Sequence, residues 1–231
     1  MHQIAANLAA VRTRIEAACV AAGRPSGSVR LLPVSKTRSA ADVRAAVAAG
    51  CTRFGENKAQ EASAKAAELA DVPGLEWVMI GHLQSNKARL VAQFAAEFQA
   101  LDSLHLAAEL DRRLQTAGRR LDVLIQVNSS GEASKFGLPP GEVVRFAKAL
   151  TPFDTLRVRG LMTLALPSPD PEQVAACFER VLDAQRRLRD AAVPGQSYGE
   201  LSMGMSGDFE LAIAHGATVV RIGTAIFGAR G

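Results

Sequence analysis

The sequence predicts an α/β fold: a single (β/α)8 TIM-type barrel with an extra N-terminal helix, in one domain that spans residues 1–231. Three observations support this prediction. Short apolar runs alternate with helical stretches, this unit occurs eight times, and 231 residues is a length that one barrel fills. Parallel strands that are buried on both faces show such continuous apolar runs. An open doubly wound sheet is the alternative arrangement of the same units.

The extra helix is predicted over residues 3–22, where Ile4, Leu8 and Val11 begin a series of apolar residues at three- and four-residue steps that Gly23 ends. No linker rich in proline, glycine or serine divides the chain, and the glycines are expected at the ends of elements. The eight units are predicted, strand then helix, at 31–35 and 39–49, 52–55 and 58–69, 76–80 and 85–94, 98–101 and 104–117, 122–127 and 141–150, 156–164 and 172–191, 201–203 and 209–215, and 219–222 with a short terminal turn.

Composition and charge argue against several classes of protein. The net charge of +4 is spread over helix faces without interleaved aromatic residues, so we expect no nucleic-acid partner. The three cysteines, Cys19, Cys51 and Cys177, match neither metal-ligand nor disulfide spacing, which favours a reducing compartment. Neither a signal peptide nor a transmembrane run is apparent, so we expect a cytoplasmic protein that does not contact a membrane.

Lys36 is the strongest candidate for chemistry, because it directly follows the first apolar run. The ligand site of a parallel barrel lies at the C-terminal ends of its strands, so the Lys36 amine is expected at the rim beside apolar walls. Desolvation there favours the neutral amine that forms an imine with an aldehyde. A solvated lysine in an ordinary loop is the alternative, and position alone does not exclude it.

Two glycine-containing loops near the C-terminus predict a phosphate site. Gly204-Met205-Ser206-Gly207 and Gly223-Thr224 each precede a predicted helix, and they offer backbone N–H groups and hydroxyls to an anion. They follow strands seven and eight, where barrels of this type often bind phosphate. Simple helix capping by Ser206 and Thr224 is the alternative.

Arg221, on the last strand, could point into the barrel and donate to a ring nitrogen of the ligand, or form a surface salt bridge. His82, after the third strand, could be a base, but without an evident acidic partner we favour a packing role. The other histidines, at positions 2, 105 and 215, show no pair with metal-ligand spacing, so no metal is predicted.

Several long motifs in one order resemble the YggS/PROSC family of pyridoxal 5′-phosphate (PLP) homeostasis proteins, and the match runs almost end to end. The motifs are Leu32-Pro33-Val34-Ser35-Lys36-Thr37, Phe54-Gly55-Glu56-Asn57 with Gln60-Glu61, Ile80-Gly81-His82-Leu83-Gln84-Ser85-Asn86-Lys87, Lys135-Phe136-Gly137, Arg159-Gly160-Leu161-Met162-Thr163, Leu201-Ser202-Met203-Gly204-Met205-Ser206 with Asp208, and Arg221-Ile222-Gly223-Thr224 with Ile226-Phe227-Gly228.

The resemblance implies a fold like the barrel domain of alanine racemase, with PLP as its cofactor. It implies a PLP imine on Lys36, Arg221 near the pyridine nitrogen, phosphate contacts from Ser206, Gly223 and Thr224, and a pocket lined by Asn57, Ser202 and Met203. Where the family often has a second lysine two residues after the imine lysine, this chain has Arg38, which keeps the charge but cannot form an imine. Lys135 is a hypothetical second PLP binder.

Two functions follow from the resemblance. The first is a non-catalytic carrier that buffers PLP and delivers it to PLP-dependent apo-enzymes, and the second is an amino-acid racemase or a related fold-type III enzyme. Racemases of similar fold need a second base, a tyrosine from an additional domain. The only tyrosine here is Tyr198, before the seventh strand, and the chain ends just after the barrel, so we expect a monomeric carrier. A scaffold or nucleic-acid module, the third class, would be colourless.

Overall fold

The computed structural model describes residues 2–132, 135–193 and 196–229. Within these ranges eight strands form one parallel sheet: β1 (Arg30–Pro33), β2 (Arg53–Glu56), β3 (Glu76–Met79), β4 (Ala95–Leu101), β5 (Leu121–Val127), β6 (Leu156–Thr163), β7 (Glu200–Ser202) and β8 (Val219–Ile222). Their order in the sheet is β1-β8-β7-β6-β5-β4-β3-β2.

The sheet closes into a nearly complete barrel. β1 and β2 stand at the two ends of the strand order, and a parallel bridge between Val34 and Gly55 joins them. The Ser35 N–H also donates to the Gly55 carbonyl at 3.0 Å. The predicted (β/α)8 barrel is therefore confirmed, and the open doubly wound sheet is wrong.

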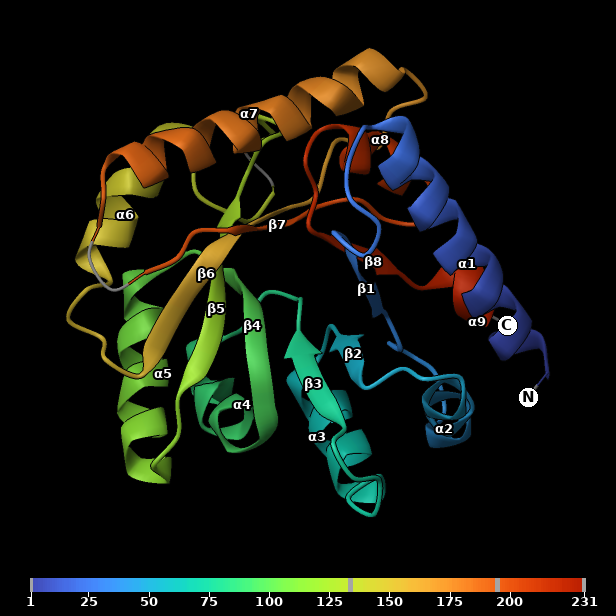
Figure 1. Cartoon of the computed structure of the whole chain (residues 1–231). Helices are drawn as coiled ribbons and strands as arrows, with labels where there is room; N and C mark the ends of the chain where they lie inside the picture. The colour runs from blue at the N-terminus through green and yellow to red at the C-terminus, as the bar shows by residue number, and fades with distance from the viewer. Residues whose placement is uncertain (1, 133–134, 194–195, 230–231) are drawn as a thin grey trace.

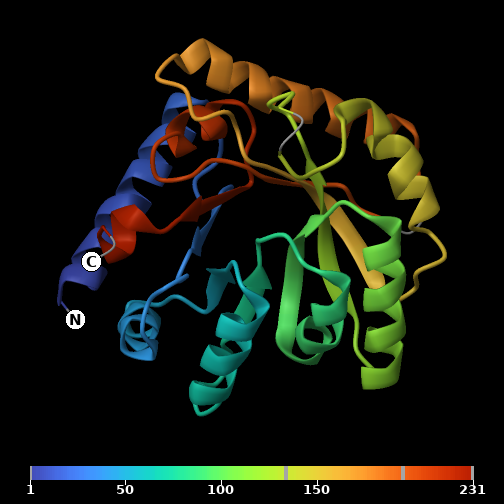
Figure 2. The same cartoon turned by 180° about the vertical axis from the view of Figure 1, so that it is seen from behind.

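Helices cover the outside of the barrel (Figure 1). The N-terminal α1 precedes the first strand, as predicted, and packs against α2, α8 and α9; Figure 2 shows it beside the C-terminal elements. No helix of the described ranges is long and apolar enough to cross a membrane. The helices are α1 (His2–Ala21), α2 (Ala40–Ala48), α3 (Ala59–Glu68), η1 (Ser85–Lys87), α4 (Ala88–Phe94), α5 (Leu104–Ala117), η2 (Pro140–Glu142), α6 (Val143–Ala149), α7 (Pro171–Asp190), α8 (Phe209–Ala214) and α9 (Thr224–Phe227).

The apolar side chains divide between two clusters. Most lie between the strands and the surrounding helices, where Phe54 of β2 and Trp77 of β3 pack at 6.2 Å between ring centroids. The second cluster is small and consists of Leu32, Val78 and Val219 with Ile80 packed against them. Its members come from the paired strands β1 and β8 and from β3, which pairs with neither of them, so this cluster occupies the barrel interior.

Charged side chains close the N-terminal end of the barrel. Arg30 of β1 reaches Glu97 of β4 at 3.1 Å and Glu200 of β7 at 2.7 Å, and Arg53 reaches Glu97 at 3.3 Å. Because β1 and β4 are not neighbours in the sheet, the Arg30–Glu97 contact spans the interior. Glu97 is buried, so the two arginines offset the cost of removing its charge from water.

Gly160 corrects the expectation that glycines lie at the ends of elements, because it stands inside β6. A Cβ at this position would lie 1.8 Å from the carbonyl oxygen of Glu200 and 2.8 Å from its nitrogen. The backbone of β7 thus approaches β6 too closely for any side chain, which is a recognised reason for glycine within a strand.

We predict that Gly160→Ala destabilises the fold, because the new methyl group must displace the β7 backbone. The expected loss is about 1–3 kcal/mol of unfolding free energy, as for other overpacked sites, and urea unfolding measures it. Gly141→Ala is the matched control, since a Cβ there meets no atom within 4 Å. Equal stabilities of the two variants would contradict the prediction.

Candidate functional site

Lys36 lies in the loop after β1, at the C-terminal rim of the barrel, and its side chain is half-buried. It follows the bridge residue Val34 and the fully buried Ser35. Thr37, the next residue, has a φ of 63°, which is rare for a β-branched residue. Within the described ranges the Lys36 amine makes no hydrogen bond or ion pair.

Arg221 points into the barrel, so the alternative of a surface salt bridge is wrong. The side chain is 3% exposed, and its guanidinium donates to Ser202 Oγ at 2.7 Å and to the Thr163 carbonyl at 2.6 Å. Burial lowers the pKa of Arg221 to about 10, against the opposing charge of Asp208, so the group stays protonated at neutral pH. Two of its five N–H donors are used by these bonds, and the others are available to an acceptor.

A directional hydrogen-bond chain continues from Arg221 into the barrel. Ser202 Oγ accepts from Arg221 and donates to Gln99 Oε1 at 2.6 Å, and Gln99 Nε2 donates to Glu97 Oε1 at 2.5 Å. Arginine can only donate and a carboxylate can only accept, so every proton in the chain has one possible position. The chain connects the rim to the charged end of the barrel.

The sequence analysis missed Gln99 and Glu97. Their signal is the alternation Glu97-Phe98-Gln99 within a buried strand, in which side chains take opposite faces in turn. Phe98 joins the outer apolar cluster, so both polar neighbours face the interior.

The two glycine loops lie beside each other and are joined by a hydrogen bond. Ser206 Oγ accepts from the Ala225 N–H at 3.4 Å, so Ser206 caps α9 from the neighbouring loop. The N-cap of α9 itself is Gly223 and not Thr224, and the N-cap of α8 is Asp208. Ser206 therefore does cap a helix, but this helix is α9 and not α8, which follows Ser206 in the sequence. Thr224 is not a capping residue.

Gly223 lies against the first strand. A Cβ on Gly223 would approach the Val34 carbonyl oxygen to 3.1 Å, which is tighter than most real contacts. With α8 of six residues and α9 of four, the helix dipoles contribute little at these loops. An anion there depends mainly on local N–H groups and hydroxyls.

The remaining candidate pocket residues differ in exposure. Met203 is buried beneath the β7 loop, whereas Asn57 is exposed after β2 and its carbonyl packs against Gly81. All eight candidates follow or end strands β1, β2, β7 and β8, so the structure brings them to one arc of the C-terminal rim. They are Lys36, Asn57, Ser202, Met203, Ser206, Arg221, Gly223 and Thr224.

Other residues of the rim have structural contacts. His82 is exposed and stacks on Phe136 with 3.9 Å between ring centroids, which agrees with the packing role favoured from sequence. Asn128 Nδ2 donates to backbone carbonyls of its own loop, and Lys135 ion-pairs with Glu132 at 3.1 Å.

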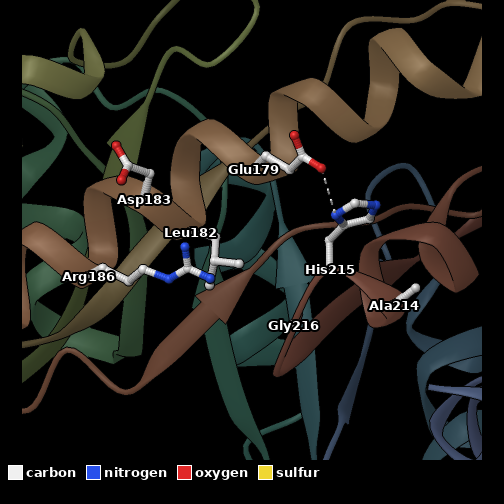
Figure 3. A pocket seen from close by; sticks show the side chains of 7 residues that line it. All are labelled: Glu179, Leu182, Asp183, Arg186, Ala214, His215 and Gly216. Atoms are coloured by element: carbon white, nitrogen blue, oxygen red, sulfur yellow. Dashed lines mark ion pairs between the residues drawn. The ribbon is translucent and has the colours of Figure 1, made fainter. Parts of the chain in front are cut away.

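A surface hollow between α7 and α8 is a poor candidate for the site (Figure 3). His215 lies there 3.8 Å from Glu179, but it precedes β8 and so lies toward the N-terminal ends of the strands. The hollow is on the outer wall, away from Lys36. Its lining residues are Glu179, Leu182, Asp183, Arg186, Ala214, His215 and Gly216.

Comparison with known proteins identifies the family. Residues 3–231 match the model of the alanine racemase N-terminal domain. The pyridoxal phosphate homeostasis protein of Pseudomonas aeruginosa is 47% identical over 232 residues, which cover 100% of this chain and 97% of that protein. The chain belongs to the pyridoxal phosphate homeostasis protein family. The Escherichia coli member is 43% identical, with 100% and 98% of the two chains covered.

Solved structures agree with this family. PipY of Synechococcus elongatus, with PLP bound, superposes with a TM-score of 0.86 at 38% identity, covering 98% of this chain and 100% of PipY. Alanine racemase of Streptomyces coelicolor has a TM-score of 0.70 at 21% identity, covering 96% of this chain and 59% of the racemase. The latter likeness concerns the fold alone.

We predict that Gln99 and Ser202 are energetically coupled, because Gln99→Leu leaves the Ser202 hydroxyl without its acceptor and Glu97 Oε1 without its Gln99 donor. Gln99→Leu should lower the unfolding free energy by about 1–3 kcal/mol, and adding Ser202→Ala should cost less than the sum of the single changes. A urea double-mutant cycle measures this coupling. Simple additivity would show that the hydrogen-bond chain does not act as a unit.

Proposed function

We propose that this family member binds PLP at the C-terminal rim and acts in intracellular PLP homeostasis, holding the cofactor as a Schiff base on Lys36. The observation that carries the proposal is that a loop lysine, two joined glycine loops and a buried guanidinium lie on one arc of the C-terminal rim. The PLP-bound PipY, 38% identical over nearly the whole chain, supports it. So do the names of the curated relatives.

The residues fit the cofactor. PLP supplies an aldehyde that condenses with a primary amine, and a phosphate dianion. Lys36 is the amine at the rim, and the Ser206 and Gly223-Thr224 loops would supply hydroxyl and backbone N–H groups to the phosphate. A Cβ at Gly223 would come within 3.1 Å of the Val34 carbonyl oxygen, so glycine lets this loop pack closely against the segment that leads to Lys36.

Arg221 favours binding over catalysis. A protonated guanidinium that donates to the pyridine nitrogen keeps that nitrogen unprotonated, which weakens the ring as an electron sink. Two hydrogen-bond acceptors, Ser202 Oγ and the Thr163 carbonyl, hold the Arg221 guanidinium in a donor role, and its pKa of about 10 keeps it charged across the physiological range.

Tyr198 cannot serve as the second base opposite Lys36. It precedes β7 and therefore lies toward the opposite end of the barrel, and it is buried. Burial raises the pKa of its hydroxyl to about 12, which disfavours the phenolate. We therefore propose a non-catalytic carrier that passes PLP to apo-enzymes in the cytoplasm. The likeness of fold to alanine racemases makes a PLP-dependent racemase the second candidate.

We predict that the purified protein loaded with PLP shows an absorbance band near the edge of the visible range and that Lys36→Ala abolishes it. Borohydride reduction followed by peptide mass spectrometry should place the trapped cofactor on residue 36. Lys135→Ala removes the other half-buried rim lysine, the hypothetical second binder, and should leave the band in place. Persistence of the band in Lys36→Ala would overturn the assignment.

We also predict that the loaded protein does not turn over amino acids. When it is incubated with amino acids in deuterium oxide, α-proton exchange should stay below one equivalent per protein, as judged by proton NMR. Sustained exchange beyond stoichiometry would favour the racemase.

A further inference from the structure

A buried lysine on α3 contacts the backbone on which Lys36 stands. Lys65 is 6% exposed, and its ammonium donates to the Ser35 carbonyl at 2.6 Å, to Glu56 Oε1 at 2.7 Å and to Glu61 Oε1 at 2.8 Å. An ammonium has three N–H donors, so all of them are used. Lys65 therefore acts as a cation and not as a nucleophile.

The two carboxylates extend these contacts to both neighbours of Lys36. Glu56 Oε1 also accepts from the Ser35 hydroxyl at 2.6 Å, and Glu61 Oε1 accepts from the Thr37 N–H at 2.5 Å. We call Ser35, Thr37, Glu56, Glu61 and Lys65 the Lys65 clamp. Ser35 and Thr37 are the residues directly before and after Lys36, so the clamp binds the backbone on both sides of Lys36.

The clamp maintains a backbone conformation that the chain alone disfavours. Thr37 has a φ of 63°, in the left-handed region that a β-branched residue rarely adopts. The hydrogen bond to Glu61 stabilises this conformation, because it engages the N–H of the strained residue itself. Such strain is often found where a functional group must be held in one orientation.

The buried carboxylate of Glu56 needs the hydrogen bond from Lys65, because it has lost its contact with water. Glu56 is fully buried, and loss of water raises its pKa, while hydrogen bonds from Lys65 and Ser35 act in the opposite direction. Removing one partner of a buried ion pair is strongly destabilising, because it leaves the other charge uncompensated. Glu61 is less buried, with its side chain 25% exposed, so it can be changed at lower risk to the fold.

We propose that Lys65 is a positioning residue for Lys36. Through Glu56 and Glu61 it holds the segment 35–37 in the conformation that brings the Lys36 amine to the ligand's aldehyde, so that the amine nitrogen bonds to the aldehyde carbon and the carbonyl oxygen leaves as water. Preorganisation of this kind accelerates bond formation by removing the entropy of alignment. The inference rests on the proposed function of Lys36.

Two ligands separate positioning from binding. PLP forms the covalent bond, whereas pyridoxine 5′-phosphate carries an alcohol in place of the aldehyde and cannot. With Glu61→Ala, stopped-flow absorbance should show covalent attachment of PLP slowed by about tenfold or more, which corresponds to about 1.4 kcal/mol. Affinity for pyridoxine 5′-phosphate should change by less than about twofold, since the phosphate and ring contacts are untouched.

Glu109→Ala is the matched control. Glu109 is also a helical glutamate paired with a cation four residues later, and its side chain is 22% exposed, but it lies on α5 away from the rim. Glu109→Ala should change neither the rate of covalent PLP attachment nor the affinity for pyridoxine 5′-phosphate. Glu61→Gln keeps an acceptor for Thr37 and should restore at least part of the rate. Lys65→Met, where it folds, should be at least as slow as Glu61→Ala.

The outcomes are distinguishable. A wild-type protein that forms no borohydride-trappable product on Lys36 sinks the proposed function. A wild-type protein that does form it, with Glu61→Ala matching Glu109→Ala on PLP, overturns the positioning role alone. Equal weakening of both ligands by Glu61→Ala also overturns it, because a general loss of structure does not distinguish the aldehyde from the alcohol.

Discussion

The parallel pairing of β8 with β1 is the constraint on which the site depends. It joins segments almost at opposite ends of the sequence: Arg30 N donates to Thr218 O at 2.8 Å, and Val34 N donates to Ile222 O at 2.9 Å. The register aligns Pro33 with Ile222. Because both strands end at this level, the loops that carry Lys36 and Gly223 leave the barrel side by side. For the same reason a Cβ at Gly223 would crowd the Val34 carbonyl oxygen, at 3.1 Å.

The interior of this barrel is more polar than the apolar layers that usually fill such barrels. Its polar side chains form few isolated contacts and are instead linked from Arg221 through Ser202 and Gln99 to Glu97. Each hydrogen bond contributes only about 0.5–1.5 kcal/mol to the stability of the fold, which is less than the cost of leaving one buried polar group unsatisfied. The hydrogen-bond chain is therefore not explained by stability. It fixes one orientation of the Arg221 guanidinium.

The fold could be predicted from periodicity because nearly every strand is a short apolar run between helices. The boundaries were less predictable. β4 begins at Ala95, three residues before the predicted start, since α4 ends at Phe94 and the strand follows without a linker. The alanines at positions 95 and 96 are compatible with either element, so the sequence contains no signal for this change.

The site could be predicted in part. The position of Lys36 at a strand end indicated that residue as a candidate. The two glycine loops were indicated by their positions after the last two strands, which are neighbours in a barrel. Gln99 and Lys65 could not be assigned, because their partners are distant: Ser202 lies 103 residues from Gln99, and Ser35 lies 30 residues from Lys65. The helix around Lys65 predicts an ordinary i,i+4 pair with Glu61 and gives no hint that the pair is buried beneath another loop.

The two lysines near the rim illustrate how burial and hydrogen bonding divide roles between identical side chains. Lys65 is enclosed and its three N–H donors meet three oxygen atoms, two of them from carboxylates, so none is left for a ligand. Lys36 is half-buried and makes none of these contacts. A protein that must bind an aldehyde at one amine and at no other needs such a difference, because every neutral lysine within reach would compete for it. The Lys65 clamp produces this difference. It engages all the N–H donors of Lys65, which keeps Lys65 out of the chemistry, and it uses the contacts of Lys65 to hold the segment that carries Lys36.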